Sequence, residues 1–311
     1  MKPQSIKILS TNISTKKGTI KKPVEFIELN SHGVKDDAHA GSWHRQVSML
    51  GTESFDKFSK EAGRKIEFGE FAENITTQGM EIFKTSPLDR FMNKDIELEV
   101  TQIGKKCHGD SCAIYNEVGN CVMPKEGIFV RVIRGGKLEE GVVLEYHPHI
   151  FKTLIITLSD RASKGEYADR SGPRVKELIE TFFDMNNFKY EVENVVIPDD
   201  ETQLKKLVSE AKDKYDFVFT TGGTGIGHRD ITVDVVKPML DKEIPGIMDM
   251  IRMKYGMEKP NALISRSVAG IMNNTMIFTL PGSVKAVNEY MTEITKVLRH
   301  LVLMLYGIDA H

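Results

Sequence analysis

Residues 216–230, DFVFTTGGTGIGHRD, form a glycine-rich segment that ends with an aspartate. It contains Gly222, Gly223, Thr224, Gly225, Arg229 and Asp230. Closely spaced glycines allow successive backbone N–H groups to converge on an anion such as phosphate. The string is no Walker A loop, since no Gly-Lys-Ser/Thr follows, and the dinucleotide spacing G-x-G-x-x-G fails at His228. We therefore expect a phosphate or other anion site here, with a purely structural turn as the alternative.

Two other segments carry matching chemistry. Asp199 follows the apolar run 194–197, and the tripeptide Pro281, Gly282 and Ser283 follows the apolar run 275–280. A helix that begins at such a tripeptide offers free N–H groups to an anion. Carboxylates beside phosphates usually hold magnesium, so Asp199 and Asp230 are candidate Mg²⁺ ligands. Each aspartate taken alone is more often a turn or helix cap, and their convergence on one edge of the sheet favours a site.

The elements that must position these residues alternate between strands and helices. Short apolar runs at 153–158, 194–197, 216–220 and 275–280 are typical of buried parallel strands. Between the first two we expect a helix capped by Ser171, and a last helix covers about 284–305. This alternation predicts a doubly wound α/β fold with a mainly parallel sheet, whose ligand site lies at the carboxyl ends of the strands.

The first half of the chain has a different texture. Strand-like runs at 24–29, 96–100 and 127–133 alternate with glycine turns, and one helix is expected at about 53–62. The pattern predicts a mostly β domain, a barrel or a sandwich. The segment 145–152, EYHPHIFK, separates the two textures. We therefore expect two domains, residues 1–148 and 151–311.

A polar string in the first half, residues 33–50, groups basic side chains. Lys35, His44 and Arg45 are candidates for a pocket that binds a phosphate-bearing ligand, and a solvated loop is the alternative. A metal site formed by His39 and His44 is a weaker hypothesis, because the segment is not helical.

All three cysteines fall within CHGDSCAIYNEVGNC, residues 107–121. Three interpretations stay open: ordinary core cysteines, a zinc site, or a reactive thiolate. The zinc ligands would be Cys107, His108, Cys112 and Cys121. The thiolate would be favoured by Lys105, Lys106 and Arg131.

Composition excludes several classes of protein. The 311 residues carry 42 Lys and Arg against 44 Asp and Glu, so a general nucleic-acid binder is not expected. No apolar run approaches the length of a membrane span, and the N-terminus lacks a secretory signal. Three cysteines cannot build a disulfide framework. The sequence thus predicts a cytoplasmic protein without a membrane partner.

The second half resembles the MogA/MoaB family of molybdopterin adenylyltransferases. The similarity rests on LSDRASKGEYADRSGP (158–173), TTGGTGIGHRDIT (220–232), SRSVAGI (265–271) and TLPGSVKAV (279–287). It implies that the terminal phosphate of molybdopterin attacks the α-phosphate of Mg-ATP and releases pyrophosphate. Asp199 and Asp230 would be the essential carboxylates that hold Mg²⁺. Gly222, Gly223, Thr224 and Gly225 would form the nucleotide-phosphate loop. The pterin phosphate would dock near Ser159, Asp160 and Arg161 after the first strand and near Ser283 at the start of the last helix. The remaining candidates for substrate binding are Arg229, Pro281 and Gly282.

The first half resembles the MOSC domain, a β-barrel module related to part of molybdenum-cofactor sulfurases. The similarity rests on GVKDDAHAG and WHRQVSML, on FGEFAENI (68–75), and on the cysteine stretch before GIFVRVIRGG. It implies binding of molybdopterin or molybdenum cofactor, with a cysteine that handles sulfur. Cys112 fits the pattern best, and Cys107 is the second candidate.

Both resemblances imply the same ligand, so we expect an enzyme of molybdenum cofactor biosynthesis. A non-catalytic carrier of molybdopterin and an oligomerising scaffold are the alternatives. The small-molecule partners would be the pterin and ATP. A homo-oligomer, a trimer through the second half, is expected, with other cofactor-biosynthesis proteins as further partners.

Overall fold

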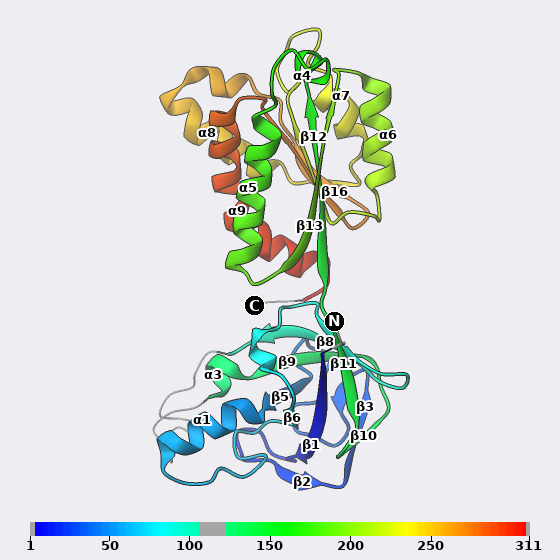
Figure 1. Cartoon of the computed structure of the whole chain (residues 1–311), viewed down its shortest axis with the longest axis vertical. Coiled ribbons are helices and arrows are strands. Elements are labelled where there is room, and N and C mark those ends of the chain that lie inside the picture. Colours follow the sequence, from blue (N-terminus) through cyan, green and yellow to red (C-terminus); the bar gives the residue numbers. More distant parts are fainter. Residues whose placement is uncertain (1–3, 106–121, 309–311) are drawn as a thin grey trace. The chain divides into compact units, whose positions relative to one another are not determined.

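The computed structural model describes residues 4–105 and 122–308. The chain divides into two compact units, Met1–His149 with Gly307–His311, and Ile150–Tyr306 (Figure 1). The division falls within the segment 145–152. Each unit is described by itself.

The first unit is a closed β-barrel. Its elements are β1 (Ser5–Ile13), β2 (Lys22–Val24), β3 (Phe26–Asn30), β4 (Gly33–Val34), β5 (Val47–Gly51), α1 (Thr52–Ala62), β6 (Ile75–Gln78), η1 (Ile82–Lys84), β7 (Arg90–Met92), β8 (Glu97–Ile103), α3 (Met123–Glu126), β9 (Ile128–Arg134), β10 (Lys137–Glu139) and β11 (Val143–His147). The main sheet has the order β11-β7-β8-β9-β5-β6-β1-β2. Because β1 also pairs with β11, the sheet closes on itself.

The barrel core explains why these short segments form strands. Side chains such as Ile6, Ile8, Val47, Val100 and Val130 are fully buried and form one apolar cluster. Alternating inward and outward positions, as at Ile6 and Ile8, are typical of a sheet with one face on the core. The predicted β-barrel is therefore confirmed.

The prediction of one continuous strand at 24–29 is wrong, because the chain forms two strands that are separated at Glu25. The two strands pair with different partners. Strand β2 pairs with β1 in the barrel, whereas β3 pairs with β10 and β4 in a separate three-stranded sheet.

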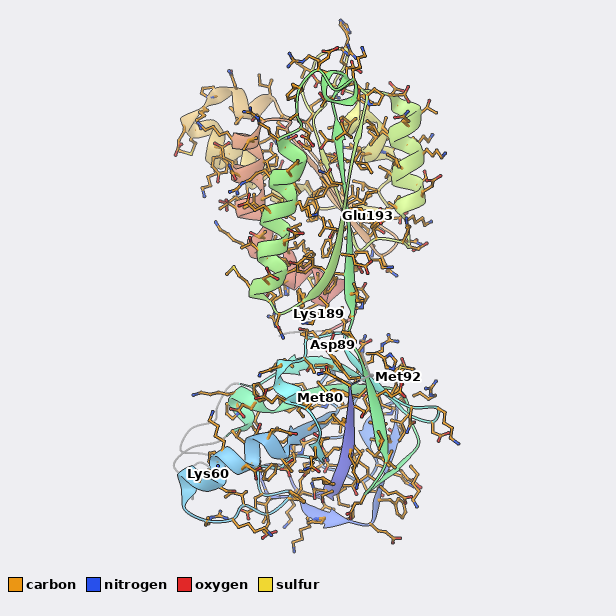
Figure 2. All side chains as sticks on the ribbon, in the orientation of Figure 1. Lys60, Met80, Asp89, Met92, Lys189 and Glu193 are labelled. Carbon is orange, nitrogen blue, oxygen red and sulfur yellow. The ribbon has the colours of Figure 1, made fainter. Side chains whose placement is uncertain are left out.

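The end of the barrel unit is tied down by a buried carboxylate. Asp89, labelled in Figure 2, accepts hydrogen bonds from the Tyr146 hydroxyl at 2.6 Å and from the His149 backbone N–H at 2.9 Å. Both donors belong to the last residues before the division of the chain. They are thereby held against the loop that precedes β7.

The second unit is built on a six-stranded sheet. Its elements are β12 (Ile150–Leu158), α4 (Asp160–Ser163), α5 (Ser171–Met185), β13 (Lys189–Ile197), α6 (Glu201–Ala211), β14 (Phe217–Thr221), α7 (Thr232–Val236), η3 (Lys237–Met239), β15 (Lys242–Glu243), α8 (Pro245–Glu258), η4 (Pro260–Ile264), β16 (Ala269–Met272), β17 (Thr275–Leu280) and α9 (Val284–Leu305). The order is β13-β12-β14-β17-β16-β15, and the first four strands are parallel. The last two pairings are antiparallel.

Helices cover both faces of this sheet. In Figure 1, α5, α8 and α9 lie on one side and α6 and α7 on the other. On the second side Leu204 and Val208 of α6 pack with Leu154 and Ile156 of β12. The predicted doubly wound, mainly parallel α/β fold is confirmed.

The prediction that Ser171 is the N-cap of α5 is wrong by one residue. Ser171 is the first helical residue, and the N-cap position belongs to Arg170. The capping acceptor is the Asp169 carboxylate, which accepts from the backbone N–H groups of Ser171 at 2.9 Å and Gly172 at 3.2 Å. An aspartate satisfies the free N–H groups of a helix start as well as a serine does.

Within residues 4–105 and 122–308, no helix has the length and apolar character needed to cross a membrane.

Candidate functional site

The loops after the parallel strands of the second unit meet at one edge of the sheet. The Gly222 N–H, just after β14, donates to the Leu280 carbonyl at the end of β17 over 3.0 Å. The Ser159 N–H, just after β12, donates to the Ile197 carbonyl at the end of β13 over 2.9 Å. Beside the loops after β14 and β17 lies a pocket of about 600 Å³, within the range of roughly 300–1,000 Å³ usual for small-molecule sites.

The glycine loop needs its glycines for two reasons. Gly222 has φ of 100°, and a Cβ added there would lie 2.4 Å from the Leu158 carbonyl oxygen. A Cβ on Gly225 would lie 2.7 Å from an Asp230 carboxylate oxygen. The loop therefore packs directly against Asp230, which accepts a hydrogen bond from the Gly227 N–H at 2.7 Å.

Arg266 holds this loop in place from outside it. Its guanidinium donates to the Gly225 carbonyl at 2.7 Å and to the Asp230 carbonyl at 2.8 Å. It also pairs with both oxygens of Asp234, at 2.7 and 2.9 Å. Because of this ion pair, the pKa of Asp234 lies below its ordinary value. The sequence analysis included Arg266 only as part of SRSVAGI and assigned it no role; its place between two serines in that string was the available signal.

Three aspartates and one arginine meet beside the glycine loop. The Asp199 N–H donates to the Asp160 carboxylate at 3.2 Å, and the Arg229 guanidinium contacts Asp160 and lies 3.9 Å from Asp199. Burial, followed by the charge of Asp230, raises the pKa of Asp199. Two neighbouring carboxylates such as Asp199 and Asp230 repel each other, and a divalent cation between them would relieve that repulsion. Among the described residues, no group of three or more acidic, His or Cys side chains has the arrangement of a metal site.

The structure brings only part of the predicted residues to the pocket. The lining includes Gly223, Thr224, Gly225, Asp230, Pro281, Gly282 and Ser283. Ser283 also caps α9 by accepting from the Ala286 N–H at 3.2 Å. Asp199, Asp160 and Arg229 are not part of this lining and contact one another.

Ser159 and Arg161 have structural contacts instead. Ser159 caps the short helix α4 by accepting from the Ala162 N–H at 3.3 Å. The Arg161 guanidinium lies over the Tyr167 ring, 5.2 Å from its centroid. Neither residue lines the pocket.

The barrel unit has a smaller polar pocket of about 140 Å³. Its lining comprises His39, Trp43, Arg45, Ser48, Ala72, Asn74, Lys105, Met123 and Phe129. The Arg45 guanidinium lies over Trp43, 4.8 Å from the ring centroid, and its buried Nε has no hydrogen-bond partner among the residues that the structure describes. The size suits a single group such as a phosphate, and the cations suit its charge.

A buried charge network lies behind this pocket. Lys21 and Asp37 form an ion pair of 2.5 Å whose side chains are each 1% exposed, and His39 Nδ1 is 3.4 Å from Asp37. Burial lowers the pKa of Lys21, while Asp37 and Glu73 oppose that change. Burial raises the pKa of Glu73 to about 7, although it accepts from the Gly69 N–H at 2.5 Å. The sequence analysis missed this network, because its members are far apart in the chain.

The other candidates of the first half divide into two groups. Lys35 forms an exposed ion pair of 2.6 Å with Glu28 and does not line the Arg45 pocket, and His44 lies outside that lining as well. His39 and His44 form no metal cluster with other described residues. Cys107 and Cys112, with His108 and Cys121, lie outside the described residues, so the zinc and thiolate hypotheses remain predictions.

Comparisons with known proteins match both units. Residues 154–300 match the family model of the "Probable molybdopterin binding domain", and residues 36–145 match the MOSC domain. The chain is 34% identical over 155 residues to a molybdopterin adenylyltransferase of Helicobacter pylori, covering 49% of this chain and 86% of the relative. It is 36% identical over 163 residues to the enzyme of that name from Pyrococcus furiosus, covering 49% and 92%. Gephyrin of Dictyostelium discoideum is 34% identical over 155 residues, which is 48% of this chain and 21% of gephyrin.

The fold and the site thus define a protein with a β-barrel unit and an α/β unit whose strand ends meet beside a pocket of substrate size. The chain belongs to the MogA/MoaB-type family of molybdopterin-binding domains through its second half, and it carries a MOSC domain in its first half. Both predicted resemblances are confirmed. A role in molybdenum cofactor biosynthesis follows from this membership.

Proposed function

We propose that the α/β unit transfers AMP from Mg-ATP to the terminal phosphate of molybdopterin. The observation that carries this proposal is that the Gly223–Gly225 loop and Asp230 line one pocket of substrate size. Relatives named molybdopterin adenylyltransferase support it, since they align with this unit over most of their own length.

The chain's own residues would contribute binding and positioning. An oxygen of the pterin phosphate attacks the α-phosphorus of ATP, the bond from that phosphorus to the β-phosphate oxygen breaks, and pyrophosphate leaves. Such a transfer needs alignment and charge neutralisation more than a nucleophilic side chain. Backbone N–H groups of the glycine loop would hold the nucleotide phosphates, and Arg266 keeps that loop in its conformation.

Asp199 and Asp230 would hold Mg²⁺, which when bound neutralises charge on the transferring phosphates. Their mutual repulsion, part of the cause of the raised pKa of Asp199, supports this assignment. Arg229, whose side chain is 70% exposed beside Asp160 and Asp199, would add a positive charge toward the nucleotide.

We infer that the MOSC unit binds the phosphate of molybdopterin or of the finished cofactor at the Arg45 pocket. Arg45, Lys105 and His39 line that pocket, and the buried Nε of Arg45 lacks a partner among the described residues. A buried donor without a partner is costly, so a bound anion oxygen would stabilise it. Sulfur handling by Cys112 or Cys107 stays a prediction of the sequence.

The test is turnover with matched variants. The full chain is incubated with molybdopterin and Mg-ATP, and pyrophosphate and adenylylated pterin are measured. We expect the wild type and the exposed control Asp249→Asn to make product, and Asp230→Asn to be slower by roughly 10²- to 10³-fold, the size of a lost electrostatic contact to a transition state. Asn keeps the acceptor for the Gly227 N–H, so the loop should stay folded. A wild type that binds the pterin and releases no pyrophosphate would contradict the transferase and leave a carrier.

A further inference from the structure

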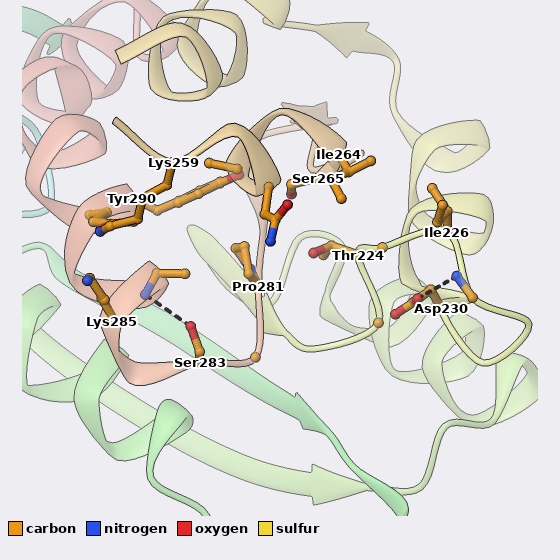
Figure 3. A pocket seen from close by; sticks show the side chains of 18 residues that line it. Thr224, Ile226, Asp230, Lys259, Ile264, Ser265, Pro281, Ser283, Lys285 and Tyr290 are labelled. Carbon is orange, nitrogen blue, oxygen red and sulfur yellow. Dashed lines mark hydrogen bonds and ion pairs between the residues drawn. The ribbon is translucent and has the colours of Figure 1, made fainter. Parts of the chain in front are cut away.

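Two lysines lie together at one end of the substrate pocket. Lys259 follows α8 and Lys285 belongs to the first turn of α9, and both line the pocket. Figure 3 shows them beside Tyr290, at the opposite end of the pocket from Asp230, with Thr224 and Ser265 between the two ends. The pocket therefore has a cationic end and an acidic end.

At the cationic end, Lys259 and Lys285 differ in their ion pairs with the described part of the chain. Lys259 Nζ pairs with a Glu289 oxygen at 3.0 Å. The neighbouring amino group of Lys259 lowers the pKa of Lys285, whereas Glu289 and Glu258 oppose that change. Within residues 4–105 and 122–308 no carboxylate forms an ion pair with Lys285. Lys285 therefore has an amino group that no described carboxylate pairs with directly, and an anion placed beside it would be stabilised.

The proposed reaction has two anionic substrates that must bind at the same time. The acidic end, with the glycine loop, suits the metal-bound triphosphate of ATP. The attacking oxygen belongs to a phosphate monoester, which carries a charge of about −1.5 to −2 at pH 7. Lysine ammonium groups bind such a group as mobile point charges.

We propose that Lys259 and Lys285 bind the phosphate monoester of the pterin substrate and thereby set which substrate occupies which end of the pocket. This assignment rests on the proposed adenylyl transfer. The lysines would orient the monoester oxygen toward the α-phosphorus held at the glycine loop. The monoester needs no base, because its oxygen is already ionised when it attacks and pyrophosphate leaves.

The test separates the two substrates. Michaelis constants for molybdopterin and for ATP are measured for the wild type, Lys259→Met, Lys285→Met and Lys285→Arg. The control is Lys206→Met, an exposed lysine of α6 outside the pocket. We expect Lys259→Met and Lys285→Met each to raise the Michaelis constant for molybdopterin roughly 10- to 100-fold, as for loss of a hydrogen bond to a charged group. The Michaelis constant for ATP should change by less than about threefold. In Lys285→Arg the Michaelis constant for molybdopterin should stay close to the wild-type value, because arginine keeps the positive charge.

A second measurement does not depend on turnover. Binding of inorganic phosphate is titrated by calorimetry with the full chain, and competition with molybdopterin is measured. We expect Lys285→Met to abolish a phosphate site that Lys206→Met keeps. Unchanged phosphate binding, or a rise of the Michaelis constant for ATP alone, would overturn the assignment. A wild type that binds phosphate at this pair without turnover would contradict only the proposed transferase.

Discussion

At the scale of residues, the site depends on side chains that hold other groups in place. Arg266 donates to the backbone carbonyls of Gly225 and Asp230 in the glycine-loop segment, and its charge is paired with Asp234. A planar guanidinium can donate to both carbonyls and to both carboxylate oxygens of Asp234 at the same time. A lysine ammonium group cannot make all four contacts. Arg266 is therefore a positioning residue.

Arg266→Lys should loosen the glycine loop without removing the charge. We expect loss of about 1–3 kcal/mol of local stability, because the Gly225 and Asp230 carbonyls lose their donors. Hydrogen exchange of the amides at 224–227 should accelerate, and the Michaelis constant for ATP should rise. Arg299→Lys, an exposed position on α9, is the control. Unaltered exchange in Arg266→Lys would contradict the positioning role.

Glu73 should give the barrel unit a pH-dependent stability. Its pKa is about 7 in the folded state and 4.5 ordinarily, so the folded state holds the proton more tightly. The stabilising contribution is complete below pH 4.5, falls as the pH rises, and is lost above about pH 7.

Urea unfolding between pH 4.5 and 8 tests this prediction. The fluorescence of Trp43, the only tryptophan, reports on the barrel unit. The wild type should lose stability across this range relative to Glu73→Gln, which keeps an acceptor for the Gly69 N–H. Parallel pH profiles for the two proteins would exclude Glu73 as the source.

At the scale of elements, the sheet edge positions the site because parallel strands end together. Gly222 is the tightest point, since its φ of 100° and its approach to the Leu158 carbonyl both exclude a side chain. The loop after β14 therefore follows a path that only glycine allows.

Gly222→Ala should destabilise the α/β unit by more than about 1 kcal/mol, because alanine is strained at this φ and meets backbone. Gly246→Ala is the matched control, since a Cβ there has open space inside the helix α8. We expect the control to keep or slightly raise the thermal midpoint and Gly222→Ala to lower it by several degrees. Equal midpoints would contradict the close packing of this loop.

Much of this architecture was predictable from the sequence. Apolar runs at 153–158 and 275–280 specified buried parallel strands, and Gly222 to Gly225 indicated a loop that needs glycine; its binding of an anion stays a prediction. The Lys259–Lys285 pair was not predictable, because the two residues lie in different helical segments and meet only through the packing of α8 and η4 near α9. Lys35 looked equivalent to Arg45 in the sequence, but β4 places it beside Glu28 instead.

At the scale of the whole molecule, two units of different fold each have a pocket lined by cationic side chains. With the pterin sites proposed above, their joining in one chain would raise the effective concentration of a pterin released by one unit near the other. We therefore expect two sites per chain for a pterin phosphate, one that contains Arg45 and one that contains Lys285.

Equilibrium binding of molybdopterin to the full chain counts these sites. We expect two per chain in the wild type and one in Arg45→Met, with affinity at the lost site reduced roughly 10- to 100-fold. Arg64→Met, an exposed arginine that pairs with Glu70, serves as the control. One site in all three proteins would contradict binding by the MOSC unit.

AMP transfer to the pterin is tested by following the α-phosphate of ATP as a label. The full chain is given molybdopterin and ATP labelled at the α-phosphate, with Mg²⁺, in a single turnover. We expect one labelled AMP group on the pterin phosphate for each pyrophosphate released, and no label on the protein. Label that appears as free AMP, or on the chain itself, would contradict direct transfer between the two substrates.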